Sequence, residues 1–273
     1  LLLVVALARP QFGSKLKEVT RTGIEMMLAV DVSNSMLAQD FEPSRLERTK
    51  FAIDRLTQQL EQDRIGLIVF AGDAYMQLPI TSDYVAARSF AAQISPTMVS
   101  KQGTAIGAAI DLAASSFSSG SEGSRVIVVI SDGENHEDDA VAAAKAAAEK
   151  GIRIYTIGIG TPEGAPISID GEFIKDEQGD MVVSKLDEQM LEQIALTTGG
   201  AYIRATNRSL GLDEIVQKIN EVEKKELTST VFEDFNEQYQ YLIGLALALL
   251  LLEFAMLERR SRLLARFNIF RKR

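Results

Sequence analysis

Short apolar runs alternate with helical segments along residues 23–224, and this alternation restricts the fold more than any other feature. The nearly continuous apolar runs are residues 24–33, 64–72, 125–133 and 152–160. Runs of this kind are typical of strands buried on both faces. Strands that alternate with helices form a mostly parallel sheet. The sequence therefore predicts a doubly wound α/β domain, with helices on both faces of the sheet.

Three segments add detail to this prediction. Residues 75–80, YMQLPI, contain Pro79 and fit an edge strand better than a central one. Residues 161–184 carry the turn signals DG and QGD between short alternating runs, which predicts a β-hairpin insertion. The helix within residues 43–62 has an expected apolar face of Leu46, Phe51, Ile53, Leu56 and Leu60. We expect the whole domain to occupy about residues 22–225.

Apolar segments also lie at both ends of the chain. Residues 239–257 form an apolar stretch of about 19 residues, which at ~1.5 Å per residue roughly spans a ~30 Å hydrocarbon layer. This predicts a C-terminal transmembrane helix. Residues 1–8 look like the end of an earlier, truncated transmembrane helix, with a buried core segment as the alternative. The basic residues after the C-terminal span predict a cytoplasmic tail at 258–273. The domain would then face the periplasm from a bacterial inner membrane.

The charge of the chain is divided unevenly. Residues 259–273 hold seven Arg or Lys and no acid, so the net charge of −9 for the whole chain leaves −16 on the rest. An acidic body disfavours nucleic acid as a partner, because phosphate binding needs clustered basic residues. The negative charge favours a cation as the ligand instead. The chain has no cysteine, which excludes disulfides, thiolate metal sites and a cysteine nucleophile.

Polar side chains follow two of the predicted strands. Asp31, Ser33 and Ser35 come at the end of the first strand, Asp132 comes at the end of the strand at 125–133, and Thr104 begins a helix. Doubly wound folds bind ligands at the carboxyl ends of their strands. Two carboxylates with several hydroxyls make an oxygen-only site that suits Mg²⁺ or Mn²⁺ and not Zn²⁺. Each element alone could instead be a turn or a helix cap.

Taken together, these residues resemble the metal-ion-dependent adhesion site (MIDAS) of the von Willebrand factor A domain. The matching elements are D-x-S-x-S at Asp31, Ser33 and Ser35, a Gly-Thr step at Thr104, and S-D-G at Asp132. The resemblance implies that the serines bind the metal directly, and that the other three bind it directly or through water. It implies Mg²⁺, with Mn²⁺ or Ca²⁺ as alternatives, and a partner protein whose Asp or Glu completes the coordination. It also implies a binding module and not an enzyme.

The arrangement of the segments around the domain narrows the resemblance. A von Willebrand A domain between one apolar segment and a single C-terminal span with a basic tail resembles the Bat group of bacterial aerotolerance proteins. The short end after the span favours the B member of that group, and the A member is the alternative. The resemblance implies partners among membrane or periplasmic proteins of the same system.

Other functions compete with this interpretation. A nucleotide-binding enzyme is disfavoured, because the glycines of TIGIGTPEG lack the G-x-G-x-x-G spacing. A metal-dependent hydrolase or phosphotransferase could use Asp31 as nucleophile, but Ser33 stands where an acid is usual. A structural anchor with a vestigial metal site would differ in one respect, that divalent metal would not change partner capture. His136 is interpreted as a solvated loop residue or a general base, and the acids at 137–139 as a helix-start cluster.

Overall fold

The computed structural model describes most of the chain. The described residues are 11–15, 23–60, 63–117, 124–135, 137–169, 171–176, 178–207, 209–229, 234–237 and 239–256. The chain divides into two compact units, residues 21–224 and the two chain ends taken together. The predictions for residues 1–8, for the tail at 258–273 and for His136 lie outside the described residues.

The larger unit is built on a six-stranded sheet. Its strands are β2 (Glu25–Asp31), β3 (Arg64–Phe70), β4 (Ala74–Thr81), β5 (Arg125–Ser131), β6 (Arg153–Gly158) and β11 (Tyr202–Arg204). Their order is β11-β6-β5-β2-β3-β4, and all neighbours run parallel except the antiparallel pair β3–β4. The predicted, mostly parallel sheet is confirmed, and the segment with Pro79 is an edge strand.

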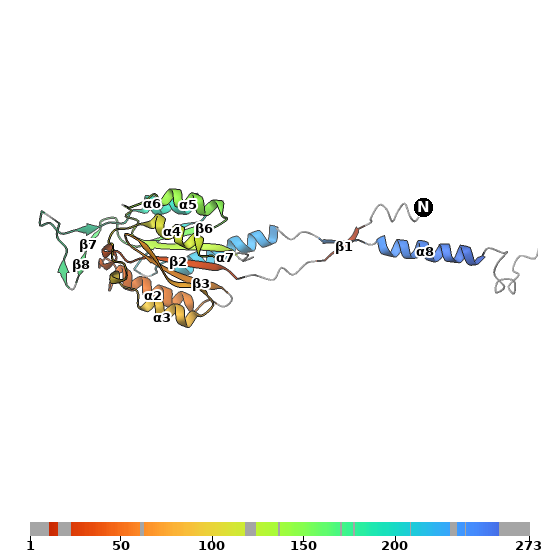
Figure 1. Ribbon diagram of the computed structural model, residues 1–273, viewed down its shortest axis with the longest axis horizontal. Coiled ribbons are helices and arrows are strands. Elements are labelled where there is room, and N and C mark those ends of the chain that lie inside the picture. Colours follow the sequence, from red (N-terminus) through yellow and green to blue (C-terminus); the bar gives the residue numbers. More distant parts are fainter. Residues whose placement is uncertain are drawn as a thin grey trace, which may run out of the picture. The chain divides into compact units, whose positions relative to one another are not determined.

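Helices cover both faces of this sheet, as predicted (Figure 1). One face carries α4 (Ile106–Ser115), α5 (Ala140–Glu149) and α6 (Glu188–Thr197), and the other carries α2 (Arg45–Thr57), α3 (Tyr84–Ala92) and α7 (Leu212–Ser229). Met26, Leu28 and Val30 of β2 join the core beneath α2, while Met27 and Ala29 join the core beneath α4. Alternate side chains of a strand point to opposite faces, so each buried strand contributes to both cores.

One residue of the expected apolar face of α2 is placed differently. Phe51 is 61 % exposed, whereas Leu46, Ile53 and Leu56 are buried. At 3.6 residues per turn, position 51 lies on the opposite side of the helix from positions 46 and 53. The prediction that Phe51 packs into the core was therefore wrong.

The segment between β6 and α6 contains four short strands. They are β7 (Ala165–Pro166), β8 (Ser168–Ile169), β9 (Glu172–Phe173) and β10 (Val183–Ser184). β8 and β9 form an antiparallel hairpin, and β7 pairs antiparallel with β10. Figure 1 shows this segment projecting beyond one end of the sheet. We call residues 161–184 the insertion.

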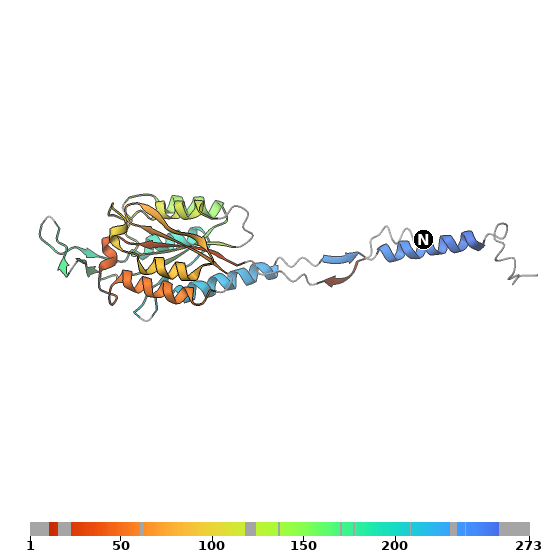
Figure 2. The same ribbon diagram turned by 60° about the horizontal axis from the view of Figure 1, so that its bottom comes forward.

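The unit formed by the chain ends contains three described elements. β1 (Gln11–Lys15) pairs antiparallel with β12 (Asp234–Glu237), and α8 (Tyr239–Met256) follows (Figure 2). In this unit, as in the rest of the described chain, no helix combines the length and the apolar character needed to cross a membrane. The transmembrane helix predicted at 239–257 is therefore not supported by the structure.

Candidate metal centre

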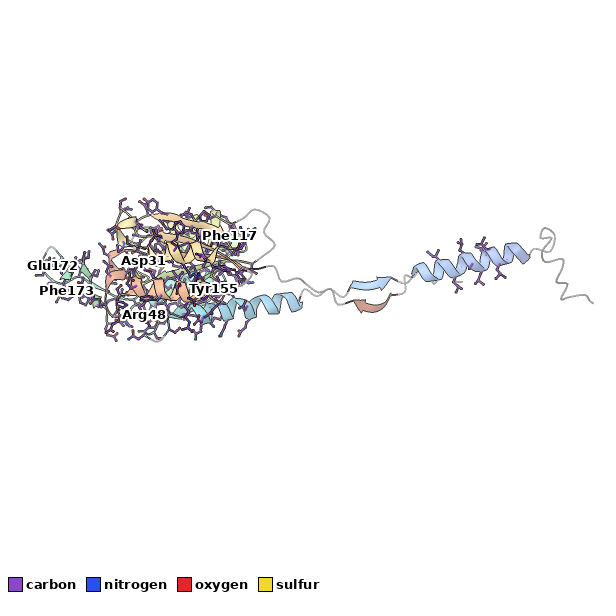
Figure 3. The ribbon with its side chains drawn as sticks, turned by 90° about the horizontal axis from the view of Figure 1, so that it is seen from below. Asp31, Arg48, Phe117, Tyr155, Glu172 and Phe173 are labelled. Carbon is purple, nitrogen blue, oxygen red and sulfur yellow. The ribbon has the colours of Figure 1, made fainter. Side chains whose placement is uncertain are left out.

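The two acids of the predicted site follow neighbouring strands at the centre of the sheet. β2 pairs with β3 on one side and β5 on the other, so the strand order reverses beside β2. In a doubly wound sheet this reversal opens a crevice at the carboxyl ends of the strands. Asp31 ends β2 and Asp132 follows β5, and both are fully buried. In Figure 3, Asp31 lies toward the end of the domain that carries the insertion.

The turn after β2 holds its polar side chains in a fixed arrangement. One carboxylate oxygen of Asp31 accepts a hydrogen bond from the backbone N–H of Ser33 at 2.8 Å. The other accepts from the hydroxyl of Ser131 at 2.7 Å. The hydroxyls of Ser33 and Ser35 lie 2.8 Å apart, at the start of the short 3-10 helix η1 (Asn34–Leu37). The turn therefore brings the Ser33 and Ser35 hydroxyls together next to the Asp31 carboxylate.

The electrostatics of this edge favour a cation. Burial and, secondarily, the nearby negative charge of Asp132 raise the pKa of Asp31 to about 7, even though the hydrogen bonds from Ser33 and Ser131 act to lower it. Two adjacent buried carboxylates repel each other when both are ionised. A divalent cation between them would remove that repulsion. The oxygen donors present at this edge fit such an ion.

Asp132 has a cationic partner that was not predicted. Arg45, the first residue of α2, is fully buried and donates from Nη1 to Asp132 Oδ2 at 3.2 Å. The Ser184 hydroxyl donates to the same oxygen at 2.8 Å. The other oxygen, Oδ1, accepts a longer bond from the Glu134 N–H at 3.3 Å. Arg45 and Ser184 therefore hold one side of the Asp132 carboxylate.

The same guanidinium binds a further acid. Arg45 donates to the two carboxylate oxygens of Asp40 at 2.8 and 2.7 Å. Burial alone would raise the pKa of Asp40, but the hydrogen bonds and positive charge of Arg45 outweigh it and hold that pKa below its usual value. Gly160 packs on this group, since a Cβ at that position would lie 3.0 Å from Cζ of Arg45. Arg45 thus bridges two carboxylates in the interior.

This network also holds both ends of the insertion. The backbone N–H of Thr161 donates to Asp40 at 3.0 Å, and its hydroxyl donates to the same oxygen at 3.2 Å. Arg45 donates to the Ser184 hydroxyl at 2.7 Å and to the Ser184 carbonyl at 3.2 Å. Thr161 and Ser184 are the first and last residues of the insertion. The insertion is therefore attached directly to the candidate metal centre.

One sequence signal could have pointed to Arg45. A basic residue in the first turn of a helix is unfavourable, because the N-terminus of a helix carries partial positive charge. Arg45 occupies that position directly after the N-cap Ser44. Its placement there suggests a partner elsewhere in the fold. Asp40 and Ser184 carry no such signal.

Thr104 lies on a loop that the structure brings to the same edge. It is buried, and it precedes Ala105, whose N–H donates to the carbonyl of Ala71 at 2.7 Å beyond the end of β3. Gln102 accepts a hydrogen bond from the N–H of Asn34 at 3.2 Å, between the two serines of the first turn. The Thr104 loop and the Asp31 turn are therefore bonded to each other.

The acids at 137–139 were predicted to cluster at a helix start, and the structure confirms this for one of them. Asp139 is the N-cap of α5. Asp138 instead accepts from two N–H groups in the first turn of α4, at 3.0 and 2.7 Å. Glu137 pairs with Lys101 at 2.6 Å. Two of the three acids thus hold α4 and the loop that carries Thr104.

This fold and arrangement of residues define the class of protein. Residues 25–221 match the von Willebrand factor type A domain, and the chain belongs to that family. An aerotolerance-related membrane protein from Bacteroides fragilis is 52% identical, with a TM-score of 0.70 and coverage of 73% of this chain and 100% of that chain. BatB from Bacteroides thetaiotaomicron is 51% identical, with a TM-score of 0.71 and coverage of 74% and 100%. The predicted resemblance to BatB is confirmed.

A more distant structure shows the fold alone. Proximal thread matrix protein 1 from the mussel byssus, solved with a zinc-occupied MIDAS motif, is 15% identical with a TM-score of 0.56. The match covers 73% of this chain and 46% of that one. At this identity the likeness extends to the arrangement of strands and helices and not to individual side chains.

Proposed function

We propose that this chain is a metal-dependent protein-binding module. Asp31, Ser33, Ser35, Thr104 and Asp132 would hold a divalent cation, and an Asp or Glu of a partner protein would complete its coordination. The observation that carries the proposal is the pair of adjacent buried carboxylates, beside two hydroxyls 2.8 Å apart, where the strand order reverses. The bound ion would supply a positive centre for the incoming carboxylate.

The charges around the site support an acidic ligand. The proposed protein ligands carry two negative charges, from Asp31 and Asp132, and Arg45 already donates to one oxygen of Asp132. The other three proposed ligands are neutral hydroxyls, so the ion would stay electrophilic enough to attract a further anion. The hard oxygen donors favour Mg²⁺, Mn²⁺ or Ca²⁺. Because the mussel protein holds zinc at its MIDAS motif, any test of metal preference should include Zn²⁺ beside these ions.

We propose that the module is not an enzyme. A hydrolase or phosphotransferase would need a further acid or base and a cation presented to phosphate. Ser33 occupies the position where such an acid is usual, and the guanidinium of Arg45 is engaged by Asp40 and Asp132. These contacts favour a protein-binding function over catalysis of hydrolysis or phosphoryl transfer. A vestigial site remains the alternative, and it predicts partner capture that is independent of metal.

Replacing Thr104 with alanine should weaken Mg²⁺ binding about tenfold, which corresponds to ~1.4 kcal/mol, and should weaken partner capture similarly. The helix should survive, because the N-cap position of α4 is Ala105 and not Thr104. Calorimetry with Mg²⁺, Mn²⁺ and Zn²⁺, and capture of membrane proteins in Mg²⁺ or EDTA, measure the two effects.

The control for this test is Asp111→Ala, an exposed acid on α4. Asp138 is unsuitable, because its carboxylate holds the start of α4. Unchanged metal binding by Thr104→Ala would remove Thr104 from the ligand set. Capture that persists in EDTA would favour the structural anchor.

Membrane attachment is the second part of the proposal. It is supported by the apolar sequence at 239–257 and by the description of the Bacteroides fragilis relative as a membrane protein. The basic tail would lie in the cytoplasm and the domain in the periplasm. We also propose that the partners are membrane or periplasmic proteins of the same system.

Single cysteines can test this orientation, since the chain has none of its own. With an impermeant maleimide and a permeabilised outer membrane, Ser115→Cys should react while Ser261→Cys should not. Ser115 is exposed, so its labelling depends on the compartment and not on folding. After full lysis both positions should react, which is the control. Reaction at position 261 alone before lysis would reverse the proposed topology.

A further inference from the structure

A groove lies beside the candidate metal centre. Its cavity volume is about 550 Å³, and its lining includes Asn34, Leu37, Val99, Gln102 and Ile169. The described residues that line it are all uncharged, and aliphatic side chains form a large part of its surface. A volume of this size falls within the usual range for ligand pockets, ~300–1,000 Å³.

The groove shares a wall with the metal centre. Asn34 lies between the proposed ligands Ser33 and Ser35, and Gln102 lies two residues before Thr104. The hydrogen bond from the N–H of Asn34 to the side chain of Gln102, 3.2 Å long, joins these two loops. A partner segment with its carboxylate on the metal would therefore place neighbouring residues in or near the groove.

The insertion supplies another part of the groove's lining. Ser168 and Ile169 of β8 line the groove, and Ile169 is 37 % exposed. Phe173 of the same hairpin is 51 % exposed, and Figure 3 shows it at the projecting end of the domain. The bonds of Arg45 and Asp40 to Ser184 and Thr161 fix the insertion at its base. Arg45 and Asp40, beside the metal centre, thus hold one of the segments that line the groove.

We propose that this groove binds a large apolar side chain from the same partner segment whose Asp or Glu completes the metal coordination. The inference rests on the proposed function and adds the chemistry of the partner, an acidic residue with an aliphatic or aromatic residue nearby in sequence. A charged side chain in the groove would lose water without gaining an opposite charge. An apolar side chain would bury surface against Leu37, Val99 and Ile169.

Selection of random displayed peptides on the full chain in Mg²⁺ tests this inference. We expect the selected peptides to share one acid and one large apolar residue at a constant spacing. Leu37→Ala and Ile169→Ala should each weaken the binding of these peptides about tenfold, because each variant removes apolar surface against which the anchoring side chain packs. Calorimetric binding of Mg²⁺ alone should stay unchanged in both variants.

The matched control is Leu196→Ala, which removes an apolar side chain that is 65 % exposed on α6, outside the groove. This variant should bind the selected peptides as the unmodified chain does.

The outcomes separate this inference from the proposed function. Peptides that need Mg²⁺ and an acid, but show no apolar preference and bind Leu37→Ala normally, would overturn the groove and leave the proposed function intact. Peptides that bind equally in EDTA would overturn the proposed function and this inference with it. Self-association of the full chain that Leu37→Ala abolishes would identify a second copy as the occupant, against the partner proposed here.

Discussion

Replacing Asp31 with asparagine should abolish divalent-metal binding and, at the same time, stabilise the metal-free chain at neutral and higher pH. The loss of binding follows because the variant removes one of the two carboxylate charges of the site. The gain in stability follows because burial and the neighbouring Asp132 raise the pKa of Asp31 to about 7. An ionised Asp31 is therefore unfavourable in the folded, metal-free protein.

The sign of the pH dependence follows from the same pKa. The ordinary pKa of an Asp side chain is 3.8, so between that pH and about 7 the unfolded chain has released this proton while the folded chain still holds it. The free energy of unfolding then falls as pH rises through this interval, and the loss is complete above about pH 7. Asp31→Asn should lack this contribution. We expect it to be more stable than the metal-free, unmodified chain by on the order of 1–3 kcal/mol above pH 7.

Urea unfolding at pH 5 and pH 8, with and without Mg²⁺, measures both effects. In EDTA, the free energy of unfolding of Asp31→Asn should exceed that of the unmodified chain by more at pH 8 than at pH 5. In Mg²⁺ at 100 times the dissociation constant, the unmodified chain should gain about 2.7 kcal/mol and the variant nothing. Asp111→Asn, on the exposed side of α4, is the control. It should change neither the pH dependence of the stability nor the gain in stability from Mg²⁺. A destabilised Asp31→Asn chain at pH 8 would contradict the electrostatic account, and one that still gains stability from Mg²⁺ would contradict the metal site.

Replacing Arg45 with methionine should lower the free energy of unfolding by about 3–5 kcal/mol, the range for breaking a buried ion pair from one side. The guanidinium is fully buried and donates to Asp40, Asp132 and Ser184. Without it, the buried carboxylate of Asp132 and the partly buried carboxylate of Asp40 lose their cationic partner. The ends of the insertion lose the group that holds them to the rest of the domain.

A metal should restore part of this loss. Mg²⁺ on Asp132 would compensate the charge that Arg45 no longer balances, so the variant should lose less stability in Mg²⁺ than in EDTA. Hydrogen exchange should show faster exchange at 161–184 in the variant. Arg55→Met is the matched control on the same helix, since Arg55 pairs with Asp213 at 3.3 Å while its side chain is 71 % exposed. An exposed pair of this kind contributes about 0–1 kcal/mol. Similar losses for the two variants would show that Arg45 has no special structural role.

Local patterns in the chain determined the sheet and the first part of the site. The strands at 24–33 and 125–133 are recognisable because a strand buried on both faces needs apolar residues at every position. The turn at Asp31 and Ser33 is recognisable because its contacts join residues only two apart, such as the 2.8 Å bond from the Ser33 N–H to Asp31. The convergence of Asp31 and Asp132 followed from the general geometry of parallel sheets.

Contacts between distant residues were decided only by the tertiary structure. Arg45 reaches Asp132, 87 residues away, and Ser184, 139 residues away. A charged residue on a helix has the same sequence pattern whether it faces solvent or a buried acid, so periodicity cannot distinguish the two. The bonds of Asp138 to α4 and the pairing of β1 with β12 are of the same kind. The residues of the candidate site could thus be predicted from the sequence, whereas the contacts that support them and the groove depend on how distant segments pack.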